Sequence, residues 1–372
     1  MAAPSIPNLL SLRGSRGGGR GRGSRRGGPF GGTAASGPSH DTTIQGTDTD
    51  ASVSRLSAVD MGYLEDPYAQ YFVQNQMGPA TRRLPIINRA LDRLIDAFLS
   101  SDLGSGTGKK QIVSLGAGTD TRCFRLLSRN NVTGLIYHEV DFPTISSKKR
   151  QVVQSTPALR NTITPDPPHA EHDASSTSSW SSTHLPNNCE YWCHGIDLRD
   201  LAQATTPPLP GLQPGVPTLL VSECCLCYLQ TSQGKDVIKH FTEQLPDLSI
   251  IIYEPVKPGD PFGKQMVANL GARRIHMPTL EDYREPADQE TRLKEAGFQT
   301  SKAMTVEAIW KQWIKPEEKK GSMSSRASMR LKSGIYLPTT MSWHGVGEVM
   351  AFKLGRTYDD DRSAGSLRSV LS

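Results

Sequence analysis

The chain has 372 residues, of which 36% are hydrophobic, and a formal net charge of +5 at neutral pH. Six arginines within residues 1–40 supply this excess, because the rest of the chain carries 36 basic and 37 acidic side chains. The charge of that remainder gives no indication of nucleic-acid binding, and no apolar run approaches the roughly 20 residues needed to span a bilayer.

Residues 1–50 are rich in Gly, Ser, Arg and Thr, a composition that predicts a disordered tail. Such an Arg/Gly-rich tail can bind RNA through phosphates, but a solvated tail is the simpler interpretation. A transit peptide is the other alternative, although the Gly and Pro content argues against the amphipathic helix that these peptides form. A second disordered tail is expected over residues 356–372.

A domain is expected over residues 51–355, and its first part is helical. Three helices are expected there, over residues 53–60, 67–77 and 86–100. Four residues at helical spacing give the last of them one apolar face: Leu91, Leu94, Ile95 and Phe98. We expect residues 51–105 to form an N-terminal helical lid.

From residue 111 the pattern changes to strands that alternate with helices. Strands are expected over residues 111–115, 135–140, 190–194, 217–222, 248–253, 298–305 and 346–354. Helices are expected over residues 121–129, 143–154, 232–244, 260–271 and 288–296. This alternation predicts an α/β fold with a doubly wound, mostly parallel, Rossmann-like sheet. The polar segments 155–188 and 315–330 are expected to be loops, the first a flexible insert.

The most informative segment is the glycine turn Leu115-Gly116-Ala117-Gly118-Thr119-Asp120-Thr121-Arg122. A strand, a glycine turn and a helix in succession are typical of nucleotide or nucleoside cofactor sites. Thr121 stands where a dinucleotide fingerprint needs its third glycine. A cofactor without phosphates, S-adenosylmethionine, therefore fits the turn better than one with a pyrophosphate.

Acidic residues end the later strands in the order that an adenosyl site requires. Asp141 follows the glycine turn at the spacing of an acid that binds ribose hydroxyls. Asp197 is suited to the adenine amino group, with Leu198 packed on the ring. Glu223 is suited to the cationic amino-acid end of the cofactor or to a wall of the site. An acid at a strand end is often only a helix N-cap, but several in this order favour a cofactor site.

Six cysteines do not form a disulfide framework in a chain of this length. Cys224, Cys225 and Cys227 are expected inside a strand and are interpreted as free thiols rather than metal ligands. No metal site is expected. His138 and His194 lie in expected strands and are interpreted as core or wall residues.

Several motifs together resemble the leucine carboxyl methyltransferase family over residues 50–355. The motifs are Leu-Gly-Ala-Gly-x-Asp-Thr-Arg, Glu-Val-Asp-Phe-Pro, Gly-x-Asp-Leu-Arg-Asp-Leu, Ser-Glu-Cys-x-Leu-x-Tyr-Leu and Tyr-Glu-Pro. The resemblance also takes in Arg55-Leu-Ser-Ala-Val-Asp-Met-Gly-Tyr63, Asp66-Pro67-Tyr68, and Asp260-Pro-Phe-Gly263 with Met266. The Arg/Gly-rich leader looks like that of fungal members.

The resemblance implies the fold of class I S-adenosylmethionine-dependent methyltransferases. It implies a methyl ester formed on the C-terminal leucine carboxylate of the catalytic subunit of protein phosphatase 2A. No catalytic base is expected, because a carboxyl terminus is ionised at neutral pH. The implied cofactor-binding residues are Arg55, Arg89, Gly116, Asp141, Asp197, Leu198 and Glu223. We expect a monomer without membrane contact, in the cytoplasm or the nucleus.

One segment departs from the family pattern. Family members usually continue Ile-Asn-Arg-Gly with an aromatic residue and a second arginine, whereas Ile87-Asn88-Arg89 runs directly into Ala90. Arg82 and Arg89 are the nearest replacements for the arginine that would face the cofactor or the substrate carboxylate. The alternative function is therefore a non-catalytic homologue that binds the cofactor or the phosphatase. A tRNA methyltransferase paralogue is less favoured, because such proteins carry an additional repeat domain.

Overall fold

The computed structural model describes the greater part of the chain, namely residues 40–60, 62, 64–73, 85–101, 108–165, 178–203, 206–313 and 348–353. Four expectations lie outside these residues: the tail before residue 40, the loop 315–330, the tail 356–372 and the role of Arg82.

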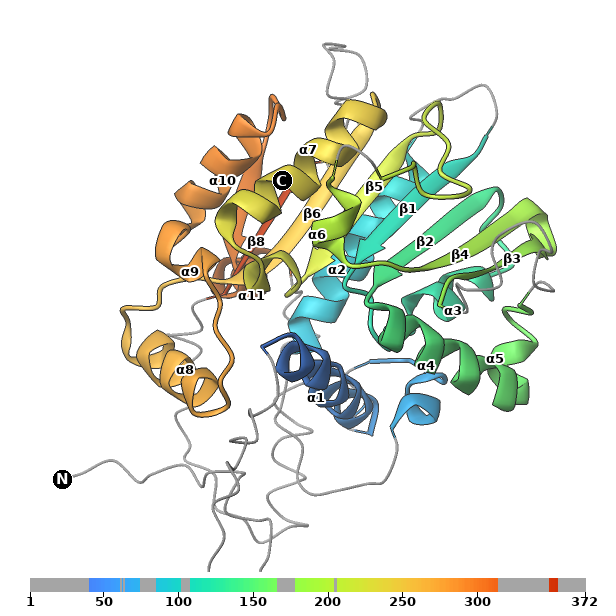
Figure 1. Cartoon of the computed structure of the whole chain (residues 1–372), viewed down its shortest axis with the longest axis horizontal. Coiled ribbons are helices and arrows are strands. Elements are labelled where there is room, and N and C mark those ends of the chain that lie inside the picture. The colour runs from blue at the N-terminus through green and yellow to red at the C-terminus, as the bar shows by residue number, and fades with distance from the viewer. Residues whose placement is uncertain are drawn as a thin grey trace, which may run out of the picture. The chain divides into compact units, whose positions relative to one another are not determined.

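Eight strands are found in the described ranges: β1 (Lys110–Leu115), β2 (Leu135–Asp141), β3 (Trp180–Leu185), β4 (Cys189–Gly195), β5 (Thr218–Glu223), β6 (Leu248–Pro255), β7 (Lys302–Thr305) and β8 (Glu348–Lys353). They form one sheet in the order β3-β4-β2-β1-β5-β6-β8-β7 (Figure 1). The central strands β4, β2, β1, β5 and β6 are parallel, while β3 and β8 pair antiparallel with their inner neighbours. The expected doubly wound, mostly parallel sheet is confirmed.

The helices connect and cover the strands. The α-helices are α1 (His40–Asp60), α2 (Pro85–Ser100), α3 (Arg122–Leu127), α4 (Pro143–Ser155), α5 (Pro157–Arg160), α6 (Leu198–Leu201), α7 (Thr231–Gln244), α8 (Pro261–Ala272), α9 (Thr279–Asp282), α10 (Pro286–Glu295) and α11 (Val306–Trp313). The short 3-10 helices are η2 (Ala69–Phe72), η3 (Pro186–Asn188) and η4 (Leu226–Tyr228). No helix in the described residues is long and apolar enough to cross a membrane.

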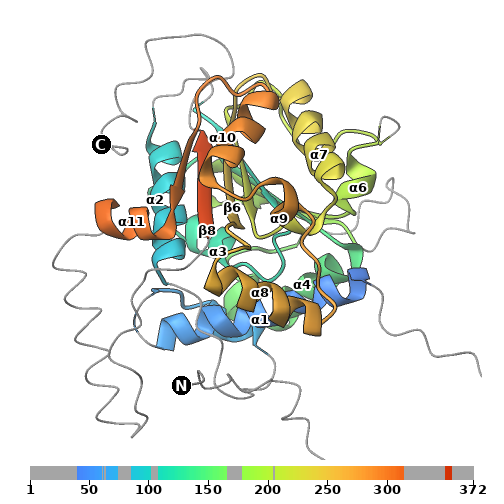
Figure 2. The ribbon, with the colours of Figure 1, turned by 90° about the vertical axis from the view of Figure 1, so that its left-hand side faces the viewer.

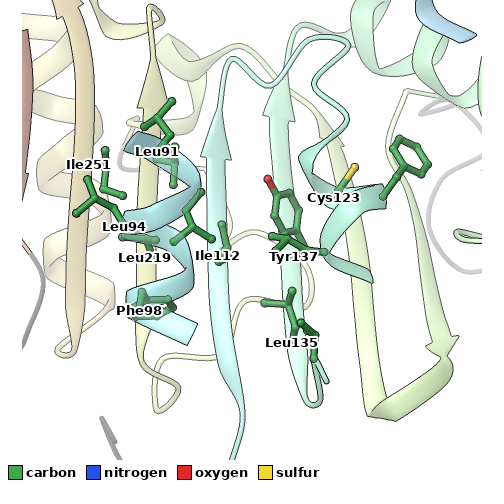
Figure 3. Packing of buried hydrophobic residues seen from close by; sticks show 14 of the residues in the cluster. Leu91, Leu94, Phe98, Ile112, Cys123, Leu135, Tyr137, Leu219 and Ile251 are labelled. Carbon is green, nitrogen blue, oxygen red and sulfur yellow. The ribbon is translucent and has the colours of Figure 1, made fainter. Parts of the chain in front are cut away.

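The core lies on both faces of the sheet, because its parallel strands are continuous apolar runs. Ile112 and Val113 of β1 point to opposite faces and belong to separate hydrophobic clusters. Helices α2, α3 and α11 pack on the Ile112 face, where Leu91, Leu94 and Phe98 meet the strands (Figure 3). Helices α6, α7 and α10 cover the Val113 face.

The N-terminal helices have other bounds than expected. Helix α1 begins at His40 rather than near residue 53, so it includes residues expected in the disordered tail. Its polar sequence gives no apolar period, and ion pairs join it to the domain, among them Arg199–Asp41 and Arg273–Asp50. Of the helix expected over 67–77, the described residues 67–73 form only the short η2, followed by extended backbone at Val73. Helix α2 belongs to the core.

Two other expectations need correction. The insert 155–188 is not wholly a loop, because α5 and the edge strand β3 form within it, and Trp180 packs on Tyr191 with ring centroids 5.0 Å apart. The cysteines after Glu223 are not in a strand. Strand β5 ends at Glu223, Cys224 adopts a left-handed φ of 49°, and the chain turns into η4. All six cysteines are free thiols.

Candidate functional site

A cavity of about 390 Å³ opens at the carboxyl ends of the parallel strands, within the size range of small-molecule sites. Its walls come from the ends of β1, β2 and β5, the segment after β4, and α1. Helix α1 lies along this edge of the sheet next to α8 (Figures 1 and 2). This is where open parallel sheets bind their ligands.

The glycine turn forms the floor of the cavity and requires its glycines. Gly116 has a φ of +59°, and a Cβ atom there would lie 2.5 Å from the Sγ atom of Cys225. Gly118 has a φ of +52°, and a Cβ atom there would lie 2.6 Å from an Asp48 carboxylate oxygen. The left-handed backbone and the close contacts both exclude larger residues.

Two carboxylates accept hydrogen bonds from successive backbone amides of this turn, those of Gly118 and Thr119. The Gly118 amide donates to Oδ2 of Asp141 at 2.7 Å, and the Phe142 amide donates to Oδ1 at 2.7 Å. Burial raises the pKa of Asp141 to about 6, although both hydrogen bonds act in the opposite direction. The amide and hydroxyl of Thr119 both donate to Oδ1 of Asp48, each at 2.7 Å. Helix α1 is thereby fixed to the turn.

Asp197 follows the carboxyl end of β4 and caps the N-terminus of α6. Its Oδ1 accepts the Arg199 amide at 2.9 Å and the Arg199 Nε at 2.9 Å. Burial raises the pKa of Asp197, but the hydrogen bonds and charge of Arg199 outweigh it and leave the pKa below its usual value. Arg199 also reaches Asp41 of α1 at 2.8 Å. Leu198 lines the cavity beside Asp197.

Glu223 and Arg55 are both connected to Asp120 of the glycine turn, Glu223 through Arg122 and Arg55 directly. Arg122, which is 3% exposed, donates to Glu223 at 3.2 Å and forms an ion pair with Asp120. Arg55 of α1 donates to the Thr119 carbonyl at 2.9 Å and lies 3.5 Å from Asp120. A buried charge network therefore sets the positions of both residues.

The structure brings together six of the seven residues expected to bind the cofactor. Arg55, Gly116, Asp141, Asp197, Leu198 and Glu223 all line the cavity. Arg89 does not line it and is exposed on α2.

Other lining residues were missed, including Asp48, Arg199 and Tyr228. Asp48 belongs to the segment expected to be disordered, so no signal pointed to it. Arg199 and Tyr228 lie inside motifs noted in the sequence, and their positions there could have indicated them.

The two histidines are core residues, as expected. His138 and His194 are 0% and 3% exposed, and neither is among the residues that line the cavity. Nδ1 of His138 lies 3.0 Å from Nε2 of His194, and the rings stack. Burial lowers the pKa of His194 to about 4 and also lowers that of His138.

Comparison with known proteins identifies the family. The model of the leucine carboxyl methyltransferase family matches residues 43–242. Leucine carboxyl methyltransferase 1 of Emericella nidulans is 42% identical over 349 residues, which cover 86% of this chain and 87% of the relative. The chain belongs to the leucine carboxyl methyltransferase family.

A second relative within the family is leucine carboxyl methyltransferase 1 of Aspergillus fumigatus, 43% identical over 360 residues, 86% of this chain and 87% of the relative. Among solved structures, an O-methyltransferase family protein from Burkholderia thailandensis has 12% identity and a TM-score of 0.35, covering 72% of this chain and 56% of that one. Family membership makes this protein a carboxyl methyltransferase that uses S-adenosylmethionine.

Proposed function

We propose that this protein forms a methyl ester on the C-terminal leucine carboxylate of the catalytic subunit of protein phosphatase 2A. The observation that carries the proposal is the cavity at the carboxyl edge of the sheet, in a chain of the leucine carboxyl methyltransferase family. The relatives' name supports a leucine carboxylate as methyl acceptor, and the phosphatase subunit follows from the resemblance in motifs.

The residues of the cavity fit S-adenosylmethionine. The glycine turn leaves a cradle that a Cβ atom would fill. Asp141 would bind the ribose hydroxyls, Asp197 the adenine amino group, and Leu198 the face of the ring. Glu223 would bind the cationic amino group at the amino-acid end. When bound, the cofactor supplies a methyl group on a positively charged sulfur.

The chain itself has three tasks, namely to bind the two reactants, to align them and to exclude water. A general base is not required, because a carboxyl terminus with a pKa of about 3.5 is already ionised at neutral pH. The arginines among the described lining residues are Arg55 and Arg199. Arg199 is paired with two carboxylates, whereas Arg55 is paired with one, Asp120 at 3.5 Å, and donates to the Thr119 carbonyl. We therefore assign Arg55 to an anionic group of the cofactor or substrate.

The position of Arg89 favours one alternative function. Arg89 is exposed on the core helix α2 and does not line the cavity, so it does not replace the family's second arginine in this conformation. A homologue that binds the cofactor or the phosphatase without turnover would have this arrangement. Calorimetry that shows binding of both, together with no methyl transfer, would favour this alternative.

The proposal is tested by incubating the protein with labelled S-adenosylmethionine and the phosphatase catalytic subunit. We expect label in the full-length subunit and none in a subunit that lacks its terminal leucine. The matched control is the Asp141→Asn variant, which should bind S-adenosylhomocysteine weakly and transfer little label. An unlabelled full-length subunit, with cofactor binding shown by calorimetry, would contradict the proposal.

A further inference from the structure

A buried lysine lies beneath the glycine turn and has no part in the roles assigned so far. Lys149 projects from α4, and its side chain is 1% exposed. Its Nζ donates to the Asp120 carbonyl at 2.8 Å and to Oε2 of Glu139 at 2.6 Å. The ammonium group therefore joins the backbone of the turn to a carboxylate at the end of β2.

Glu139 is held in place from the other side. The Tyr191 hydroxyl donates to the same oxygen, Oε2, at 2.6 Å, and Glu139 is 1% exposed. Lys149 also lies 5.8 Å from the centre of the Phe124 ring and 5.9 Å from that of Phe72. This surrounding shell leaves the ammonium group little freedom to leave the Asp120 carbonyl.

Asp120 connects Lys149 to the cofactor residues. Its amide donates to the Ala117 carbonyl at 2.8 Å and closes the turn. Its carboxylate pairs with Arg122, which in turn contacts Glu223, and lies 3.5 Å from Arg55. A displacement of Asp120 would therefore move the turn and the two charged residues beside it.

The ion pair is poorly explained by stability alone. Taking two charges out of water costs several kcal/mol each, and apolar replacements of a buried pair are often neutral or stabilising. We propose that Lys149 is a positioning residue, which holds the Asp120 carbonyl and so keeps the glycine turn in the conformation that binds the cofactor. This inference rests on the cofactor site of the proposed function and not on the identity of the methyl acceptor.

The test removes both charges, because Lys149→Met alone would leave Glu139 buried without its cation. The double variant Lys149→Met/Glu139→Gln is compared with Arg292→Met/Glu254→Gln. This matched control removes another buried pair, joined at 2.9 Å with both side chains at most 1% exposed and outside the cavity lining. Calorimetry measures the Kd for S-adenosylhomocysteine, and thermal unfolding measures Tm.

We expect the Lys149 double variant to raise Kd about tenfold, the effect of losing one charged hydrogen bond. The control should keep Kd within twofold whatever its change in Tm. An unchanged Kd in the Lys149 double variant, or an equal rise in the control, would overturn the inference.

A conservative variant covers the case in which the double variant does not fold. Lys149→Arg keeps a cation beside Glu139 but replaces the compact ammonium group, which donates to two acceptors from one nitrogen atom, with a larger planar guanidinium. A raised Kd with an unchanged Tm supports the positioning role, whereas a lowered Tm with an unchanged Kd overturns it, because the contacts of Lys149 would then be disturbed without any effect on binding. Tight binding by the wild-type protein without methylation of the phosphatase would contradict the proposed function only, since these binding measurements would still decide the role of Lys149.

Discussion

Asp141 shows how a single buried carboxylate can set the conditions under which the site works. It accepts two backbone amides, yet burial raises its pKa to about 6. Above this pH the carboxylate is ionised and can accept hydrogen bonds from hydroxyl groups. Below it the carboxyl group is protonated and loses part of this capacity.

Cofactor affinity should therefore depend on pH through Asp141. If only the ionised form binds, about a tenth of the protein can bind at pH 5. The Kd for S-adenosylhomocysteine should therefore be about tenfold higher at pH 5 than at pH 7. Calorimetry at several pH values measures this change. The Asp141→Asn variant should bind weakly at every pH, and a wild-type Kd that is flat between pH 7 and pH 5 would contradict the assignment.

Gly116 makes a steric prediction at the same scale. In Gly116→Ala the added Cβ would lie 2.5 Å from Cys225 Sγ in a left-handed backbone, so we expect a loss of about 1–3 kcal/mol of stability and weaker cofactor binding. Denaturant unfolding and calorimetry measure the two effects. The matched control is Gly215→Ala, where a Cβ meets nothing within 4 Å. Equal behaviour of the two variants would show that the turn tolerates a side chain.

At the scale of elements, β2 and β4 carry a buried histidine pair that makes stability depend on pH. The folded-state pKa of His194 is about 4, against 6.5 for an exposed histidine. Between these two pH values the unfolded chain therefore binds more protons than the folded chain. The free energy of unfolding is not reduced by His194 above pH 6.5, and it decreases as the pH falls from 6.5 toward 4. For His194 the loss is about 3 kcal/mol.

Urea unfolding at pH 7, 6 and 5 measures the part of this loss, about 2 kcal/mol, that falls between pH 7 and pH 5. Asp141 acts in the opposite direction, because its raised pKa stabilises the folded state as the pH falls through 6 toward 3.8. The comparison of wild type with His194→Gln isolates the histidine contribution. The stability of the variant should fall less between pH 7 and pH 5, and parallel curves would contradict the assigned cause.

Helix α1 marks the limit of prediction at this scale. Helix α2 could be predicted from Leu91, Leu94 and Phe98, because burial of an apolar face follows from spacing. The first half of α1 has no such period, and contacts distant in sequence, such as Asp48 with Thr119, hold it in place. Edge strand β3 was missed for the same reason, since its partner β4 determines it.

For the whole molecule, the mostly parallel sheet and the location of the cavity followed from the sequence. Short apolar runs predicted the parallel strands to within two residues, and parallel strands place their carboxyl ends at one edge. The acids Asp141, Asp197 and Glu223 could therefore be expected to meet there. The buried residues that hold the site in place, including Lys149 and Arg122, could not be predicted. They form ion pairs with residues on other secondary-structure elements, and no local sequence pattern indicates such pairs.

We propose that this protein methylates a C-terminal leucine carboxylate. Mass spectrometry of the phosphatase catalytic subunit, after incubation with the protein and S-adenosylmethionine, tests it most directly. We expect one added methyl group, located on the carboxylate of the terminal leucine and released by mild base as an ester. An unmodified C-terminus, or a methyl group on a side chain instead, would contradict it.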